Sequence, residues 1–169
     1  MSRFACRNPL SLFQDQLTEV GVGSIVSDSA SVADELDSRI DHPAVAWLDG
    51  EDFPLPDDVD ADPDLEAITR AETGITVARL GVASHGSIVL TQTGGLDGPV
   101  SLYPRKHVAI VRSEDIVPDL ATAFEILETD FERGADDAVF VTGPSSTGDM
   151  GEIIVGVHGP EAMEVVIAE

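Results

Sequence analysis

Cysteine and lysine are almost absent from this sequence, and long apolar runs are missing altogether. Cys6 is the single cysteine among the 169 residues. One thiol excludes a disulfide framework and a four-thiolate iron–sulfur cluster held by the chain itself, so we expect no cofactor of that kind here. No stretch approaches the roughly 18 apolar residues of a membrane span, and no apolar core of signal-peptide length adjoins the first residues. We therefore expect a cytoplasmic protein without a membrane span.

Basic residues are scarce. The chain has 32 acidic and 9 basic residues, a formal net charge of −23, and Lys106 is its single lysine. The acidic residues are spread along the chain, which is typical of proteins adapted to molar salt, where a Debye length of about 3 Å screens their repulsion. The densest acidic run, residues 57–64, is interpreted as a solvated loop. This charge disfavours nucleic acid and anionic membranes as partners, because both are negative.

Several catalytic signatures are also absent. The four histidines show no His-x-His or His-x3-His spacing, so we expect no metal site. The sequence has no Gly-x-Ser-x-Gly elbow of a serine hydrolase, and it has no Gly-x-Gly-x-x-Gly or Walker A motif for nucleotide phosphates. Function must therefore be sought in less common motifs.

Apolar periodicity predicts alternating helices and strands. Helices are expected over residues 9–20, 29–40, 65–80 and 113–128, with Ser113 capping the last helix and Ile116, Leu120, Phe124 and Leu127 facing inward. Strands are expected over residues 24–26, 44–48, 87–91, 107–111, 139–142, 153–155 and 165–167, and residues 49–64 are expected to form a loop. This order predicts one α/β domain over residues 1–169, with a mostly parallel sheet flanked by helices.

Two polar turns near the C-terminus form the main candidate site. The strand at 139–142 runs into a turn over 143–149, and a second turn over 156–160 leads to the last strand. The candidate ligand-binding residues of these turns are Gly143, Ser145, Ser146, Thr147, Asp149, His158 and Gly159. Glycine lets a ligand approach the backbone, and hydroxyl and N–H groups can hold a small anionic or polar molecule. A locally capped helix start would use the same residue types, so both interpretations stay open.

Further candidates lie upstream. Arg105, Lys106 and His107 form the densest positive patch, which can attract a carboxylate or phosphate or simply offset the acidic surface. Gly86 and Ser87 precede a strand and are less well placed, because ligands of open α/β sheets bind beyond the carboxyl ends of strands. For catalysis the candidates are His158, which can exchange a proton near neutral pH, and Asp149. We expect these segments to converge around one cavity.

Four motifs occur in order between residues 74 and 160. They are Gly74-Ile75-Thr76 running into Ala83-Ser84-His85-Gly86-Ser87, then Ser101-Leu102-Tyr103-Pro104-Arg105-Lys106-His107, then Gly143-Pro144-Ser145-Ser146-Thr147-Gly148-Asp149-Met150, and then Gly156-Val157-His158-Gly159-Pro160. With these motifs the chain resembles the LUD domain family, which includes proteins of the lactate utilization protein C type. One position departs from the family pattern: Ser84 replaces an acidic residue that is common there. If that acid takes part in family chemistry, this chain lacks it.

The resemblance implies a NagB/RpiA/CoA-transferase-like fold and a role in the oxidation of L-lactate to pyruvate. It also implies partner subunits that carry iron–sulfur clusters, and with one cysteine this chain would be an accessory or ligand-binding subunit among them. Two alternatives stay open. The chain can be a stand-alone enzyme of the CoA-transferase or sugar-phosphate isomerase type, an analogy that rests on fold alone, or a regulatory module that binds a small ligand.

Overall fold

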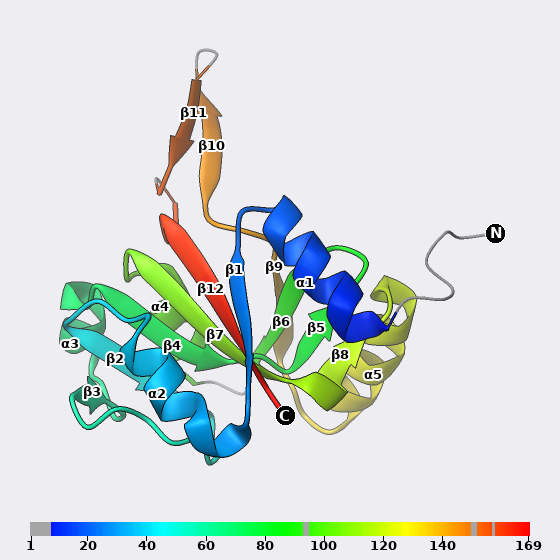
Figure 1. Cartoon of the computed structure of the whole chain (residues 1–169), viewed down its shortest axis with the longest axis horizontal. Helices are drawn as coiled ribbons and strands as arrows, with labels where there is room; N and C mark the ends of the chain where they lie inside the picture. Colours follow the sequence, from blue (N-terminus) through cyan, green and yellow to red (C-terminus); the bar gives the residue numbers. More distant parts are fainter. Residues whose placement is uncertain (1–7, 93–94, 150–151, 157) are drawn as a thin grey trace.

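The main sheet of the protein is entirely parallel. The computed structural model describes residues 8–92, 95–149, 152–156 and 158–169, with backbone only for residues 92, 147–149 and 152–154. In spatial order the six strands are β1 (Gly23–Ser27), β12 (Ala162–Ala168), β7 (Lys106–Arg112), β4 (Thr73–Val77), β2 (Ala44–Trp47) and β3 (Val59–Asp60). The expected α/β fold with a mostly parallel sheet is confirmed (Figure 1).

A smaller, mixed sheet stands beside the main one. Its strands lie in the order β8 (Ile116–Val117), β5 (Leu80–Val82), β6 (Ser87–Gln92) and β9 (Asp137–Val141), and only the β5–β8 pair is parallel. The strands β10 (Ser146–Asp149) and β11 (Glu152–Val155) form a separate antiparallel hairpin. This hairpin projects from the body at the end of the main sheet where β12 begins (Figure 1).

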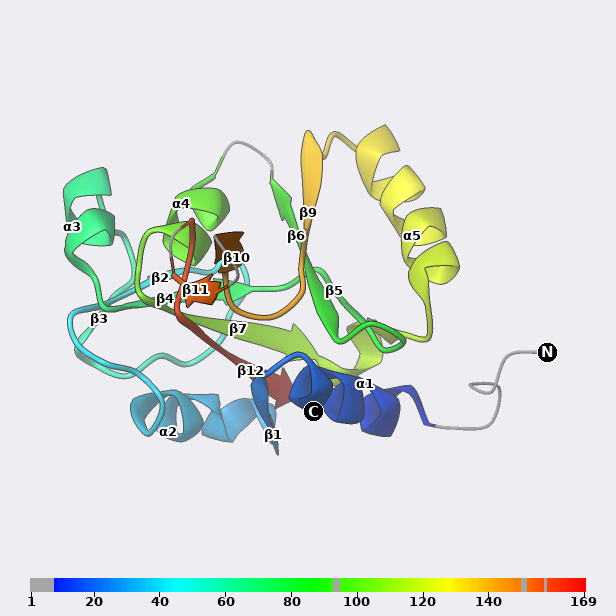
Figure 2. The same cartoon turned by 90° about the horizontal axis from the view of Figure 1, so that it is seen from above.

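Helices cover both sheets. They are α1 (Pro9–Glu19), α2 (Val32–Asp37), α3 (Leu65–Arg70), α4 (Asp97–Leu102) and α5 (Leu120–Glu132), with short 3-10 turns at Ser29–Ser31 and Ser113–Asp115. Polar residues begin three of them: the side chains of Asn8, Asp64 and Asp119 accept hydrogen bonds from backbone N–H groups of the first turn. Figure 2 shows α3 and α4 on one face of the main sheet, α2 on the opposite face, and α5 against the outer side of the smaller sheet. In the part of the chain that is described, no helix has the length and apolarity needed to cross a membrane.

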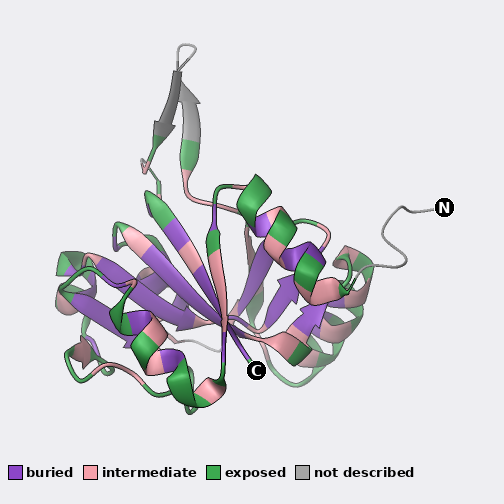
Figure 3. Cartoon of the chain, viewed as in Figure 1, coloured by how far each residue is buried: buried purple, intermediate pink, exposed green. Residues whose placement is uncertain are grey.

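The parallel strands are buried on both faces, as expected for a sheet with helices on each side. Along β7, Val108 and Ile110 pack with α2, whereas Ala109 and Val111 pack with α1 and the smaller sheet. Figure 3 shows these central strands buried and the outer helix surfaces exposed. Because the core takes up the strand faces, candidate sites are found at the two ends of the main sheet.

Several details of the predicted secondary structure are wrong, and the expected loop over residues 49–64 also contains the short strand β3. Residues 65–80 contain a six-residue helix and then β4, because Thr73 to Val77 pair with strands on both sides. The last helix begins after the cap at Asp119 rather than at Ser113, since Pro118 cannot continue a helix that starts earlier, and Phe124 is 58% exposed rather than inward. The strands at 87–91, 139–142 and 153–155 do not join the main sheet. The expected turn over 143–149 becomes strand β10 from Ser146 onward.

Candidate functional site

A groove of about 420 Å³ lies beside the base of the hairpin. We call it the hairpin groove. Its lining comes from the end of β9 and the following turn (residues 139–146), from residues 158–160, and from Leu90, Gly98, Ser101 and Leu102. Two of the turns predicted from sequence to form a site therefore share one cavity, with α4 as its opposite wall.

Backbone hydrogen bonds hold the two turns together. Ser145 N donates to Pro160 O at 2.9 Å, and Gly156 N donates to Ser145 O at the same distance. Gly159 packs against the Ser145 side chain, so closely that a Cβ at position 159 would lie 3.2 Å from Ser145 Cβ. The two turns are therefore joined to each other by backbone hydrogen bonds and side-chain packing.

Several glycines and hydroxyl groups in and near the first turn make close contacts with other parts of the fold. Gly143 has a φ of 75°, and a Cβ there would lie 2.7 Å from the Val20 carbonyl oxygen; Gly86, with a φ of 59°, faces the Gln16 backbone in the same way. Ser87 Oγ lies 2.7 Å from Thr142 Oγ1, which ties β6 to the end of β9. Gly86 and Ser87 thus contact residues near the groove, Gly86 through the backbone of Gln16 and Ser87 through Thr142, but neither lines the groove.

The chemistry of the hairpin groove is mixed. Val139 and Phe140 supply apolar surface, Ser145 and Ser146 supply hydroxyls, and the imidazole of His158 stands exposed at the same groove. Such a combination suits a small molecule that has both polar and apolar parts.

Besides Ser146, two predicted site residues lie in the hairpin itself. The backbones of Thr147 and Asp149 belong to β10, where Asp149 pairs with Glu152 at the far end of the hairpin from the groove. Their side chains lie outside the described part of the structure, as do Met150, Gly151 and Val157. The predicted roles of Thr147 and Asp149 remain predictions.

The positive patch lies next to the groove, but its charges are paired with acids. Arg105 O accepts a hydrogen bond from Glu161 N at 2.7 Å, which places Arg105 beside the second turn. Its guanidinium binds the Glu161 carboxylate, with Nη2 2.7 Å from Oε2, and these hydrogen bonds hold the pKa of Glu161 below its usual value. Arg105 is therefore adjacent to the groove, but its guanidinium is paired with Glu161 and does not line the groove.

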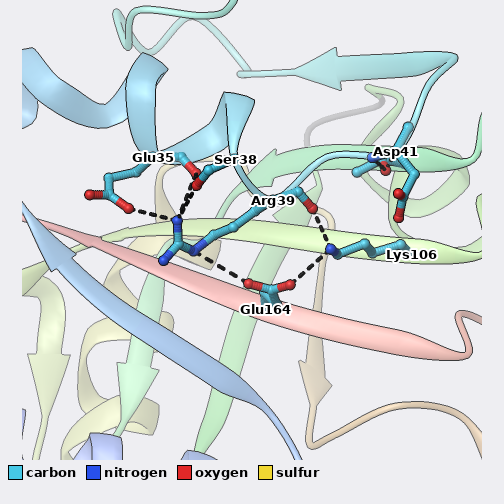
Figure 4. Close-up of polar contacts among 7 residues, drawn as sticks. Glu35, Ser38, Arg39, Asp41, Lys106 and Glu164 are labelled. Carbon is cyan, nitrogen blue, oxygen red and sulfur yellow. Dashed lines mark hydrogen bonds and ion pairs between the residues drawn. The ribbon is translucent and has the colours of Figure 1, made fainter.

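Lys106 and His107 do not line the groove. Lys106 Nζ lies 2.8 Å from Glu164 Oε1 and also donates to the Arg39 carbonyl, while Arg39 reaches the other Glu164 oxygen at 3.4 Å (Figure 4). His107 is fully buried, with Nε2 2.8 Å from Thr76 Oγ1, and burial lowers its pKa to about 4. The structure thus gives each member of the patch a local partner.

A second pocket, which the motif analysis missed, lies at the opposite end of the main sheet. We call it the carboxyl-edge pocket. It has a volume of about 190 Å³ and is lined by residues that follow β2, β4 and β7, together with Thr91 and Asp97. The expected helix over 65–80 concealed β4, and hence the fact that Arg79 follows a central parallel strand. The sequence feature that could have indicated this pocket is the occurrence of charged residues, such as Asp49 and Arg112, directly after apolar runs.

Asp97 is the most unusual group in this pocket. It is 2% exposed, and its carboxyl group lies beside the buried indole N–H of Trp47. Desolvation by burial raises its pKa to about 6, and the charges of Asp49 and Asp137 act in the same direction, whereas hydrogen bonds from the backbone and from Trp47 partly offset the rise. A carboxyl group with a pKa near neutrality can act as an acid or a base. Among the described residues, no group of three or more His, Cys, Asp or Glu side chains is arranged to hold a metal ion.

Comparison with known proteins gives consistent matches. The model of the LUD domain family matches residues 12–168. Lactate utilization protein C of Bacillus subtilis is 35% identical over 108 residues, which cover 60% of this chain and 45% of that protein. The corresponding protein of an Exiguobacterium species is 32% identical over 142 residues, covering 82% and 61%. Lactate utilization protein C 1 of Bacillus mycoides is 32% identical over 114 residues, covering 65% and 49%. The chain spans about half the length of the curated relatives it matches.

A solved structure has the same fold. The crystal structure of a DUF162 family protein from Deinococcus radiodurans matches with a TM-score of 0.76, covering 95% of this chain and 96% of that chain at 21% identity. At this level of identity the likeness concerns the arrangement of helices and strands alone.

Proposed function

The chain belongs to the LUD domain family, and on this premise we propose that it acts in lactate utilization, as a subunit that binds a small polar or anionic ligand in the hairpin groove. The observation that carries the proposal is the similarity, at 32 to 35% identity, to the three lactate utilization proteins described above. The groove adds a binding surface of suitable size and chemistry.

L-Lactate is a fitting candidate for the hairpin groove. It is a small carboxylate with one hydroxyl and one methyl group, and the groove offers hydroxyls, an imidazole and an apolar wall. Arg105 is engaged by Glu161, so the carboxylate would be held by hydroxyl and backbone N–H donors and by an imidazole N–H of His158.

The electrons of lactate oxidation would leave through other subunits. Conversion of L-lactate to pyruvate releases two electrons and two protons, and Cys6 alone cannot bind a four-thiolate cluster. We therefore propose that iron–sulfur subunits act with this chain, and that the chain supplies ligand binding or assembly. The purified chain should show no iron–sulfur absorbance and no lactate-dependent dye reduction. Lactate oxidation by the pure chain would overturn the accessory role.

A genetic test addresses the cellular role. Deletion of the gene in its source organism should abolish growth on L-lactate as sole carbon source while leaving growth on pyruvate intact. The wild-type gene and His85→Ala should restore growth, because His85 is an exposed histidine of the β5–β6 turn outside the groove. His158→Ala should restore it poorly. Normal growth of the deletion strain on L-lactate would contradict the proposal.

A binding test addresses the hairpin groove. Titration calorimetry of the purified chain with L-lactate should show one saturable site. Ser145→Ala and His158→Ala should each weaken binding by about tenfold, since a charge-assisted hydrogen bond contributes about 1.5–3 kcal/mol. His85→Ala is the matched control and should bind as the wild type does. Equal affinities of the wild type and the three variants for L-lactate would contradict binding in the hairpin groove.

A further inference from the structure

One flank of α5 exposes two aromatic side chains. Phe124 is 58% exposed and Phe131 is 44% exposed, whereas Phe13 and Phe53 are buried. Phe124 and Phe131 are about two helical turns apart, so they lie on the same flank of the helix. A shallow groove, which we call the α5 groove, runs along this flank and is lined by residues of α5 between 121 and 132. Single apolar residues on a surface are common, but two phenylalanines on one flank form a patch that indicates an interaction site.

The open edge of the smaller sheet lies next to the α5 groove. β9 is the last strand of that sheet and pairs only with β6, and no described residue makes a backbone hydrogen bond to its other edge. The centre of the Phe124 ring lies 5.6 Å from that of Phe140 in β9, which places the groove beside this edge (Figure 2). Proteins commonly cover such an edge with a helix or a loop. Two uncovered surfaces, one on α5 and one on β9, therefore adjoin each other.

The spacing of apolar residues along the α5 groove suits a helix as its occupant. Phe124, Leu127 and Phe131 are separated by three and then four residues, the spacing of a and d positions in helices that pack side by side. Leu127 is 1% exposed and forms the floor of the groove between the two exposed rings. A helix laid along α5 would bury both rings and, on the side of Phe140, would also cover the edge of β9.

The charge of the α5 groove decides which partner it fits. Glu125, Glu128 and Glu132 are exposed along the groove, and none of the described residues that line it is basic. A second copy of this chain would bring the same three carboxylates, with a further net charge of −23, against them. An anionic membrane would be repelled for the same reason. A helix that carries lysine or arginine beside its apolar stripe is complementary to the groove.

We propose that the α5 groove, together with the adjoining edge of β9, is the docking surface for a basic amphipathic helix of a partner protein. The apolar stripe of that helix packs on Phe124 and Phe131, and its basic residues pair with the glutamates of the groove. The proposal stands on α5 and β9 alone. Its test does not involve the hairpin groove or L-lactate, so its failure would leave the proposed function untouched.

A synthetic peptide of about three heptads is the probe, with leucine at a and d and lysine at e and g. The lysines keep the peptide from pairing with itself. A second peptide has the same composition in scrambled order, so it keeps the charge and lacks the apolar stripe. Fluorescence anisotropy at one fixed KCl concentration should show the ordered peptide binding about tenfold more tightly than the scrambled one. Equal affinities would mean that charge alone attracts the peptide and would overturn the proposal.

A variant of the aromatic residues tests their part in docking. Phe124→Ser combined with Phe131→Ser should remove the preference for the ordered peptide. Leu65→Ser is the matched control, because it removes an exposed apolar side chain of α3 outside the groove, and it should keep the preference. A preference that survives in the phenylalanine variant would overturn the proposal.

A variant of the acidic residues tests the charge complementarity. Glu125→Gln combined with Glu128→Gln should weaken binding of the ordered peptide several-fold more than Asp57→Asn combined with Asp58→Asn. Both pairs of substitutions remove two negative charges, but Asp57 and Asp58 lie outside the groove. Equal weakening by the two pairs would show a general attraction to the acidic surface and would overturn the proposal.

Two further measurements guard against a variant that fails to fold and against a different occupant. In the wild-type chain, NMR titration with the ordered peptide should shift the amides of residues 121–132 and 137–141. Shifts centred elsewhere would overturn the proposal. Sedimentation in molar KCl should give the same mass for the wild type and the phenylalanine variant. A wild-type dimer that the phenylalanine variant does not form would make a second copy of the chain the occupant and would also overturn the proposal.

Discussion

Lys106 Nζ lies 2.8 Å from Glu164 Oε1 and so joins β7 to the neighbouring strand β12 through the single lysine of the chain. Arg39 approaches the same carboxylate from beyond the end of α2, and Glu35 binds Arg39 at 2.6 Å (Figure 4). The side chains of Lys106 and Glu164 are 17% and 29% exposed. The positive patch seen in the sequence is thus used, at this position, to hold the amino ends of two central strands together.

Lys106→Met should lower the free energy of unfolding by about 1–3 kcal/mol, because it leaves the half-buried Glu164 with one cation fewer. Urea unfolding at constant high salt is the measurement. Arg70→Gln is the control, since Arg70 pairs with Glu66 on the exposed surface of α3 and should cost no more than about 0.5 kcal/mol. Equal losses in the two variants would mean that Lys106 acts only as a surface charge.

Gly74→Ala should destabilise the protein by about 3 kcal/mol or prevent its folding. A Cβ at Gly74 would overlap the backbone carbonyl of Val100 in α4 and lie 3.0 Å from Pro104 Cγ, and a backbone atom cannot rotate away. Gly23→Ala is the matched control, because its Cβ would meet the Glu164 side chain at an ordinary 3.5 Å. Circular dichroism and thermal melts compare the two, and a Gly74→Ala protein of wild-type stability would contradict the close packing of α4 on β4.

Acid should weaken the protein through His107. Burial lowers the pKa of His107 from 6.5 to about 4 in the folded protein. Its contribution to the free energy of unfolding is therefore fully present above pH 6.5, and up to about 3 kcal/mol of it is lost as the pH falls toward 4. Asp97 works in the opposite sense: its folded pKa is raised to about 6, so its ionisation weakens the fold as the pH rises from 3.8 through 6.

Two variants separate these opposing contributions. His107→Gln should lose less stability than the wild type between pH 6.5 and pH 4, whereas Asp97→Asn should lose more. Urea unfolding at several pH values in constant salt gives the slope of the free energy of unfolding against pH for each protein. Parallel slopes for the wild type and both variants would show that neither group titrates differently in the folded and unfolded chains.

Salt should stabilise the protein strongly. With a net charge of −23, self-repulsion is large in dilute buffer and is screened in molar KCl, so the thermal midpoint should rise across that range. Replacing Asp57, Asp58, Asp60, Asp62 and Asp64 by Asn removes five negative charges, from −23 to −18, and should reduce the dependence on KCl. A midpoint that stays flat or falls with KCl in the wild type would contradict an adaptation to high salt.

Features that depend on near neighbours along the chain could be predicted from the sequence. The Asn8 cap and the β2 and β7 strands follow from local hydrogen bonding and side-chain shape. The two turns of the hairpin groove were also recognised, because the hairpin that joins them is short and returns the chain to the same place. The motifs in turn indicated the LUD domain family, which the family model confirms over residues 12–168.

Only the tertiary structure decided which polar groups are buried and which are paired. Arg105 pairs with Glu161, which is 56 residues away along the chain. Asp97, the first residue of α4, is buried close to Trp47 of β2, and the local sequence does not reveal this contact. The second sheet likewise depends on pairing between β6 and β9, which are far apart along the chain. Secondary structure follows from neighbours within a few residues, whereas burial, pKa and charge pairing depend on what packs from a distance. For this reason the sequence alone indicated the hairpin groove and concealed the carboxyl-edge pocket.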